Sequence, residues 1–299
     1  MSNIYYIPLS MVADKAGFEF LSDFHDKILH SDNTDIYVNF DYCKEFEANL
    51  AAALGALLSY AISHKQCNVY VNNPREKGVR RALSRNKFLR AFEVLTQIED
   101  RETFIEYSRF GVGEILKFKN FILTNLLQKK RFPHCSEKAA DKIIESIYEI
   151  FANAVSHGGS QYVYCCGEMH TRHGRSMMDM TFVNLGTTVI ENVNNYLMKR
   201  EKTPLEPCDS LIWAFQRGNT TKPIPGGLGL DILREFITLN EGRIQMVSGN
   251  AMLEIEKDKT NSITLDRNFP GTIVNVDFNC SDQKSYKLTE ENTDLNNLL

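Results

Sequence analysis

A carboxylate, a carboxamide and an imidazole follow one another at four-residue intervals in the segment from 149 to 157. Glu149, Asn153 and His157 would therefore project from one side of a helix. Apolar residues of the same segment fall on the opposite side, which we expect to face the core. A carboxylate in this position can orient or deprotonate water, and an amide oxygen can ligate a hard cation. An ordinary polar helix face is the alternative interpretation of these residues taken alone.

Three further segments carry turn and glycine patterns of their own. Residues 178–188 alternate like a strand and run into a turn at Asn184-Leu-Gly186. Residues 218–230 are rich in glycine and proline and lead into a second helix. Residues 269–277 begin with Phe-Pro-Gly-Thr and continue as a strand. Each pattern is common by itself, so the order of the four segments carries the interpretation.

In this order and at these spacings, the four segments resemble the ATP-binding domain shared by DNA gyrase, the heat-shock chaperones, the mismatch-repair ATPases and the histidine kinases. That domain is known as the GHKL or Bergerat fold. The resemblance implies an α/β sandwich over residues 136–280, in which helices cover a mixed sheet. It also implies that the chain binds ATP together with Mg²⁺.

The resemblance gives the polar helix face a role in catalysis. Glu149 is the candidate base, since a glutamate holds this place in the ATPase members of the superfamily. Asn153 is the candidate Mg²⁺ ligand through its amide oxygen, with phosphate oxygens and water completing the octahedron. His157 is a candidate contact to phosphate or to the lid. A helix-capping role is the alternative for His157, because Gly158 and Gly159 follow it.

The turn at residues 184–188 should hold the base of the nucleotide. Family members usually carry an Asp here, which accepts a hydrogen bond from the adenine amino group. This chain has Asn184, whose oxygen can accept but whose nitrogen can donate instead, so adenine and guanine both stay open. Gly186 belongs to the same turn. Thr188 replaces the second glycine of the family motif, which restricts the backbone where the lid starts.

The second helix should begin with a phosphate cradle, because successive backbone N–H groups at a helix N-terminus favour an anion. We expect this role for Gly226, Gly227, Leu228, Gly229 and Leu230. Residues 188–225 would form a lid over the nucleotide, with Lys222 as its cation. Thr272 matches the family threonine that lines the adenine pocket.

Residues 1–95 are expected to form a separate, smaller α/β domain. Strand and helix patterns alternate in this part of the chain, at 35–42, 47–63, 67–71 and 79–89. The pattern is similar to the STAS-like domains of bacterial regulatory proteins. Phosphorylated members of that family carry an acceptor serine at the start of a helix, where this chain has Glu47-Ala-Asn49-Leu50. We therefore expect this domain to act in docking or scaffolding rather than as a phospho-switch.

The segments around the expected ATPase domain are assigned from their composition. Residues 96–135, rich in charged and aromatic side chains, are expected to be a helical connector that ends near Pro133. Between 136 and 280 we expect a helix, two strands, a long loop, a helix and then three strands. Residues 281–299 are expected to be a polar C-terminal tail.

Composition excludes several classes of protein. The formal net charge of −4 gives no sign of the clustered Lys and Arg that a nucleic-acid surface needs. The longest apolar stretch, 50–62, is too short for a bilayer span, and the start of the chain lacks a signal-peptide pattern. The seven cysteines show no zinc or disulfide spacing, and Cys165 and Cys166 should point to opposite faces of a strand. We expect a cytoplasmic protein with no membrane segment.

The leading hypothesis is a Mg²⁺-dependent ATP-binding regulatory protein, a slow ATPase whose nucleotide state controls its contacts with a protein partner. The partner would bind through the N-terminal domain or the C-terminal tail, and a homodimer stays open. One alternative is a kinase of the anti-sigma Ser/Thr type that phosphorylates a partner. The other is a module that binds ATP or ADP without hydrolysis. Glu149 favours hydrolysis, whereas the departures at Asn184 and Thr188 favour the binding module.

Overall fold

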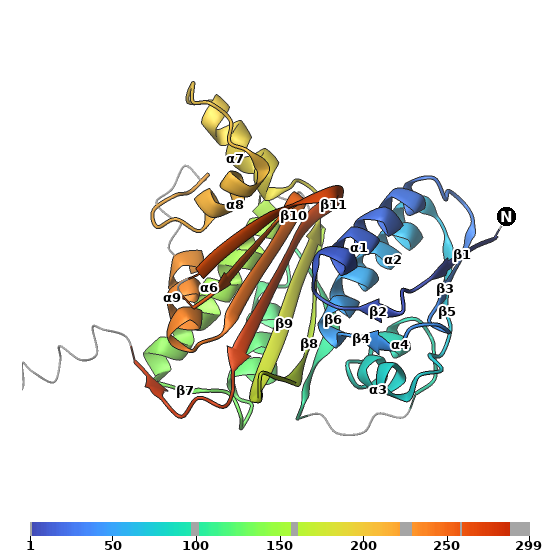
Figure 1. Ribbon diagram of the computed structural model, residues 1–299, viewed down its shortest axis with the longest axis horizontal. Helices are drawn as coiled ribbons and strands as arrows, with labels where there is room; N and C mark the ends of the chain where they lie inside the picture. The colour runs from blue at the N-terminus through green and yellow to red at the C-terminus, as the bar shows by residue number, and fades with distance from the viewer. Residues whose placement is uncertain (1, 97–101, 157–160, 222–228, 258, 288–299) are drawn as a thin grey trace, which may run out of the picture.

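A computed structural model describes residues 2–96, 102–156, 161–221, 229–257 and 259–287 of the chain. Within these ranges the protein is α/β, as expected, and its helices and sheets form four layers (Figure 1). A three-stranded sheet packs on a helical layer, which packs on a five-stranded sheet. The other face of that larger sheet carries the second helical layer. In the described part of the chain, no helix is long and apolar enough to cross a bilayer.

The three-stranded sheet is parallel and belongs to the N-terminal unit, defined here as residues 2–96. Its strand order is β1-β3-β5, with β1 at Ser2–Tyr6, β3 at Asp35–Asn39 and β5 at Asn68–Val71. Helix α1 (Lys15–Leu29) connects β1 to β3, and helix α2 (Ala51–Lys65) connects β3 to β5. The unit also contains β2 (Ser10–Met11), β4 (Glu45–Phe46), a 3₁₀ turn (Ala48–Leu50), α3 (Lys77–Arg85) and α4 (Phe88–Ala91). The strands and helices predicted for this part of the chain are confirmed, except that the last helix breaks at Lys87, whose φ is +62°.

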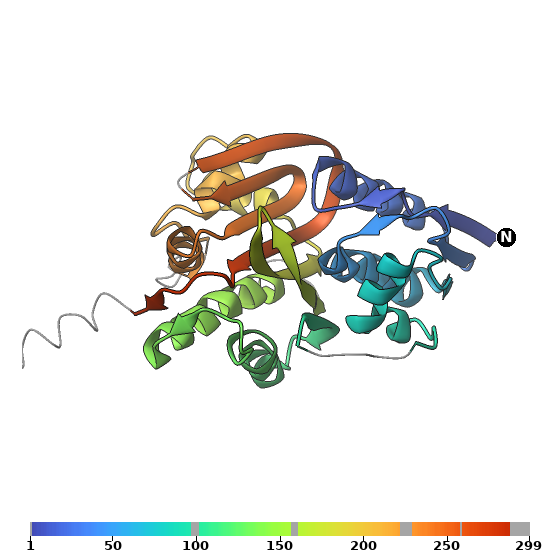
Figure 2. The ribbon, with the colours of Figure 1, turned by 60° about the horizontal axis from the view of Figure 1, so that its bottom comes forward.

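Helix α2 is buried around most of its circumference because it lies between the two sheets. Its alanine-rich sequence gives it small side chains on every side, which lets both sheets approach closely. At Gly55 a Cβ atom would lie 2.5 Å from the ring of Tyr107 in the larger sheet, so this position has room only for glycine. The N-terminal unit therefore shares a continuous core with the larger sheet instead of standing apart from it (Figure 2).

The five-stranded sheet has the strand order β10-β11-β9-β8-β6. Its strands are β6 (Phe104–Gly111), β8 (Tyr162–Arg172), β9 (Arg175–Leu185), β10 (Arg243–Glu256) and β11 (Lys259–Asn279). All of its described pairings are antiparallel, so the prediction of a mixed sheet is wrong. Two of these pairings, β8–β9 and β10–β11, join strands that follow each other directly in the chain, whereas β9–β11 and β6–β8 join strands with helices between them. The β8–β9 turn places His173 and Gly174 at positive φ, 49° and 76°, as a tight hairpin requires.

Strand β6 corrects the prediction that residues 96–135 form a helical connector. It is the edge strand of the larger sheet and pairs with β8. Aromatic and β-branched side chains favour a half-buried strand, and Phe104, Ile105 and Phe110 are buried in it. The helical part of the segment is shorter, namely α5 (Ile115–Ile122) followed by a π turn (Leu123–Leu127).

The second helical layer covers the face of the large sheet that is turned away from the N-terminal unit (Figure 2). It contains α5, α6 (Glu137–Ser156) and α9 (Gly229–Leu239). Helices α7 (Val189–Met198) and α8 (Pro207–Ala214) occupy the region where a long loop was expected. Two long strands, β10 and β11, stand where three were expected. Short strand β12 (Ser285–Tyr286) in the expected tail pairs with β7 (His134–Cys135), and residues 288–299 lie outside the described residues.

The expectation that Cys165 and Cys166 point to opposite faces of a strand is confirmed. Cys165 belongs to the core beneath α6, whereas Cys166 belongs to the core beneath the N-terminal helices, so the two thiols lie on opposite faces of β8. All seven cysteines are free thiols. Burial raises the pKa of the Cys165 thiol above its ordinary value, which keeps it protonated and unreactive.

Candidate functional site

A pocket of about 820 Å³, counting the part open to solvent, lies on the α6 side of the large sheet. Its floor is formed by side chains of β9, β10 and β11, and its walls by α6, α7, α8 and the start of α9. Its lining combines polar side chains with Trp213 and several aliphatic side chains. Such a mixture suits a ligand that has both an aromatic and a charged part.

Residues from all four sequence segments of interest meet in this pocket. Its lining includes Glu149, Asn153, Asn184, Leu230 and Thr272. Sequence reasoning selected these residues from a helix, a strand turn, a glycine-rich segment and a second strand. Their convergence follows from the sheet order, because β11 lies beside β9 and α6 lies over both.

Helix α6 contributes the carboxylate and the carboxamide. Glu149 and Asn153 lie one turn apart, and the buried residues Ile147, Ile150, Phe151 and Ala154 hold the helix on the sheet. The first residue of α9, Gly229, lies directly against the Glu149 side chain. A Cβ atom at Gly229 would lie 2.9 Å from Glu149 Cβ and closer still to its carboxylate. The glycine thus lets the helix N-terminus, with its partial positive charge, approach the carboxylate.

The sheet contributes the other polar end of the pocket. Asn184 and Thr272 are direct register partners across β9 and β11, and both are at least nine-tenths buried. Directly opposite residues of an antiparallel pair lie on the same face, so both side chains point toward α6.

Ser248 determines how the Thr272 hydroxyl is oriented. The Ser248 hydroxyl donates to the carbonyl of Gly271 (2.7 Å) and accepts from the backbone N–H of Val189 (2.9 Å). Ser248 has a single hydroxyl proton, so its 2.9 Å contact with Thr272 must use the proton of Thr272. The Thr272 oxygen therefore keeps its lone pairs for a ligand and acts as an acceptor in the pocket.

Two of the predicted residues lie elsewhere. Thr188 is the N-cap of α7, where its hydroxyl accepts from the N–H of Glu191 and the Glu191 carboxylate accepts from Thr188. Its neighbour Thr187 lines the pocket instead. Gly186, with a φ of +141°, lines a different hollow between the N-terminal helices and the sheet, so it shapes the turn instead of the pocket. Five further predicted residues lie outside the described residues, namely His157, Lys222, Gly226, Gly227 and Leu228.

The pocket also contains residues that sequence reasoning missed. Asn192 of α7, Trp213 of α8 and Asn219 lie in its wall, and Asn219 donates to the carbonyl of Trp213 (3.0 Å). Two signals could have identified these helices. Thr188 and Glu191 form a capping box, and Pro207 occupies the first position of α8, where proline is favoured.

The side chains that line the pocket decide which metal ion it could hold. Among the described residues, no group of three or more His, Cys, Asp or Glu side chains is arranged to hold a metal ion. Mg²⁺ takes few protein ligands and completes its shell with phosphate oxygens and water. The Asn153 amide oxygen fits such a role.

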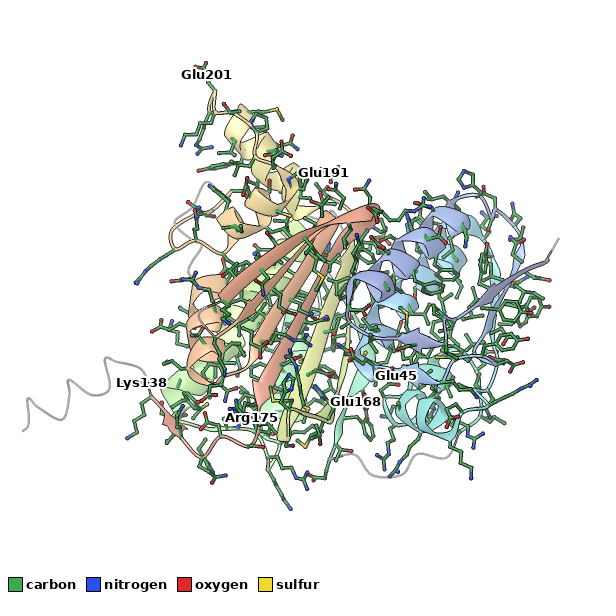
Figure 3. The ribbon with its side chains drawn as sticks, viewed as in Figure 1. Glu45, Lys138, Glu168, Arg175, Glu191 and Glu201 are labelled. Carbon is green, nitrogen blue, oxygen red and sulfur yellow. The ribbon has the colours of Figure 1, made fainter. Side chains whose placement is uncertain are left out.

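A second group of polar residues lies between the large sheet and the N-terminal unit. Glu168 accepts from the backbone N–H of Ala48 (3.2 Å), and Glu47 accepts from that of Ala13 (2.7 Å). Figure 3 shows Glu168 at this junction, at the end of the sheet away from α7. Burial raises the pKa of Glu168 and of Glu47 above their ordinary values. At this junction, burial thus favours the protonated form of both carboxyl groups more than water does.

Arg243 provides the counter-charge at this junction. Its Nε donates to Asp277 (2.8 Å), and one of its terminal nitrogens lies 3.2 Å from Glu254. Burial, followed by the charges of Glu168 and Asp277, raises the pKa of Asp179 well above its ordinary value. Asp179 lies five positions along β9 from Asn184, so its side chain is on the opposite face of the sheet. The carboxyl groups of the junction are therefore separate from the pocket.

Neither protein-family models nor curated proteins show a significant match to this chain. Its function must therefore be inferred from the arrangement of its own residues.

Proposed function

We propose that this chain is a Mg²⁺-dependent ATP-binding regulatory protein with slow ATPase activity. The main support is that Glu149, Asn153, Asn184 and Thr272, which come from three separate segments of the chain, line the same pocket. The GHKL-type order of the segments and the helix-covered sheet around the pocket agree with a Bergerat-type nucleotide site.

The base of the nucleotide would lie toward the sheet. Asn184 and the acceptor oxygen of Thr272 face this end, and both can accept from an exocyclic amino group. Met246 and Val274 of the floor are apolar and favour a planar ring over a phosphate. An adenine would therefore be read by two acceptors on neighbouring strands.

The phosphates would lie toward α6 and the start of α9. A helix N-terminus favours negative charge, and Gly229 lets the backbone come close. Bound Mg²⁺ would neutralise the triphosphate, and the Asn153 amide oxygen would be its protein ligand on this side. Glu149, one turn from Asn153, is then placed to orient a water molecule and accept its proton.

The same arrangement suggests how nucleotide could affect a partner. Val189, the first residue of α7, donates to Ser248, which also contacts Thr272. Helix α7 is thus connected to the base end of the pocket by a short series of hydrogen bonds, and α8 packs against α7. We propose that nucleotide changes the position of these helices and that the STAS-like N-terminal unit acts as the docking part of the molecule.

The proposal is tested by measuring phosphate release from ATP with Mg²⁺. Glu149→Gln keeps the size and hydrogen-bonding capacity of the side chain but removes the base. We expect it to lower turnover by about a hundredfold or more while ATP affinity changes little. Glu145→Gln is the matched control, since Glu145 is exposed one turn earlier on α6 and pairs with Lys142. Equal turnover in both variants and the parent would exclude Glu149 as the base.

A further inference from the structure

One face of the three-stranded sheet carries exposed aromatic side chains. Strand residues alternate between its two faces, and α1 and α2 cover only the inner one, where Ile36 and Val38 are buried. The outer face presents Ile4, Tyr37 and Tyr70, which are 54%, 39% and 47% exposed. Figure 1 shows this sheet at the outer side of the molecule, with α1 and α2 between it and the large sheet.

An open face of this kind is unusual for a parallel sheet. Purely parallel sheets occur almost only where both faces are covered, because the helices of their crossover connections usually lie on both faces. Here the connections β1–α1–β3 and β3–α2–β5 place both helices on the same side. The outer face is therefore a candidate surface for contact with another molecule.

The exposed side chains form a continuous row across the strands. Ile4 is the register partner of Tyr37, and Tyr37 is the register partner of Tyr70. The rings of Tyr37 and Tyr70 are stacked with their centroids 4.9 Å apart and their planes 18° apart. A second pair, Tyr6 and Tyr42, lies beside the row with centroids 5.5 Å apart, and both rings are more than half exposed.

Charge is nearly absent from this row. Asp35 accepts from the side chain of Asn68 (2.9 Å), and Asp41 lies 3.0 Å from Arg75 at the edge of the sheet. The row itself consists of neutral side chains, so it offers no electrostatic attraction for the phosphate groups of a nucleic acid or of an anionic membrane. A charged partner would need complementary charges here, whereas a neutral face can pack against an identical one without repulsion.

We propose that this face is the interface of a homodimer, in which two copies of the sheet pack face to face around a two-fold axis that runs parallel to β3 and passes near Tyr37. Such an axis places Tyr37 against Tyr37 of the partner subunit and Ile4 against Tyr70 of the partner subunit. The row is therefore self-complementary, as a two-fold interface requires.

The available area is sufficient for such a dimer. From their exposed fractions, the four tyrosines and Ile4 offer on the order of 500 Å² in each copy. Two copies would bury on the order of 1,000 Å² through these side chains alone, which reaches the lower limit of specific interfaces. The interface lies beyond the α1–α2 layer from the nucleotide pocket, so this inference does not depend on the proposed function.

The test is the mass of the full-length protein in solution, measured by sedimentation equilibrium from about 1 µM to about 100 µM. We expect a dimer, and we expect Tyr37→Arg to raise the dissociation constant about a hundredfold or more. The reason is that the axis would bring two like charges together. Leu116→Arg is the control, because Leu116 is 78% exposed on α5, in the opposite layer, and should leave the dimer intact.

A second variant keeps the test valid if Tyr37→Arg disturbs the fold. Tyr37→Cys should form a disulfide between two copies under mild oxidation, since the axis brings position 37 of both copies together. Leu116→Cys should not cross-link under the same conditions. A parent protein that stays monomeric at every concentration would overturn the proposal and would leave the face to a different partner. A Tyr37→Arg variant that folds and dimerises like the parent would also overturn it.

Discussion

Asn184 and Thr272 face each other as register partners on β9 and β11, although they come from segments of the sequence that are far apart. The sequence predicts contact with the base of a nucleotide separately for the turn at Asn184 and for the strand that contains Thr272. Their pairing places two potential acceptors side by side at the floor of one pocket. Ser248 completes the arrangement, because its oxygen accepts a hydrogen bond from the Thr272 hydroxyl.

This pairing leads to a prediction for Asn184→Asp. A carboxylate can only accept, so it favours the adenine amino group and opposes the carbonyl oxygen that guanine carries at the same place. Hydrogen bonds to charged groups are worth about 1.5–3 kcal/mol, against about 1 kcal/mol for neutral ones. We expect Asn184→Asp to tighten ATP binding and to increase discrimination against GTP about tenfold or more.

Two calorimetric titrations of each protein, with ATP and with GTP, measure this effect. Asn195→Asp is the control, since Asn195 is exposed on α7 and adds the same charge away from the pocket. Unchanged or weaker ATP binding in Asn184→Asp would mean that this side chain does not contact the base.

Gly229→Ala tests the close approach of α9 to the Glu149 side chain. The added methyl group would overlap the carboxylate and force either Glu149 or the helix to move. We expect turnover to fall about tenfold or more, and stability to fall by about 1–3 kcal/mol. Gly78→Ala is the matched control, because a Cβ atom at Gly78 of α3 meets open space. That change should be neutral or stabilising by up to about 1 kcal/mol. Equal loss of stability in both variants would contradict the assigned contact.

The element pattern of the chain was predictable where the signal is local. The alternation of 35–39 and the periodicity of α6 come from neighbouring residues, and the structure has both elements in those places. Glu149 and Asn153 could be selected because they share one helix face. Their meeting with Thr272 could be inferred only from the resemblance, because strand order is not a local property.

Other parts depend on contacts between distant residues. Strand β6 was missed because its pairing with β8 is long-range, and its aromatic side chains do not separate a strand from a helix. The all-round burial of α2 appears in its alanine-rich sequence, but nothing local says that a second sheet covers it. The wall of the pocket formed by α7 and α8 was missed for another reason, since the capping box at Thr188 was interpreted as part of a loop.

The buried carboxyl groups at the junction predict how stability depends on pH. The pKa of Asp179 is raised in the folded protein by burial and by the nearby charges of Glu168 and Asp277. Between its ordinary pKa and the raised value, the folded state binds more protons than the unfolded state. Stability is therefore complete below the ordinary pKa and falls as the pH rises through the raised pKa.

Asp179→Asn should remove this loss, because the carboxamide stays neutral and its oxygen can still accept from the N–H of Glu168. We expect the melting temperature at pH 8 to rise by about 3 °C or more, and the gain to shrink toward pH 5. Asp266→Asn serves as control, since Asp266 is exposed and pairs with Lys15 at the surface. A gain that is the same at both pH values would exclude titration of Asp179 as its cause.

Trp213 offers the most direct measurement of the central claim, because it is the only tryptophan of the chain and it lines the pocket. Its fluorescence therefore reports on this site without a label. We predict a saturable change in Trp213 fluorescence when ATP is added with Mg²⁺. The change should be much weaker for Asn153→Ala, which lacks the proposed Mg²⁺ ligand, and Asn195→Ala should respond like the parent protein. If the fluorescence does not change at millimolar ATP, ADP or GTP, and calorimetry detects no binding, the pocket is not a nucleotide site.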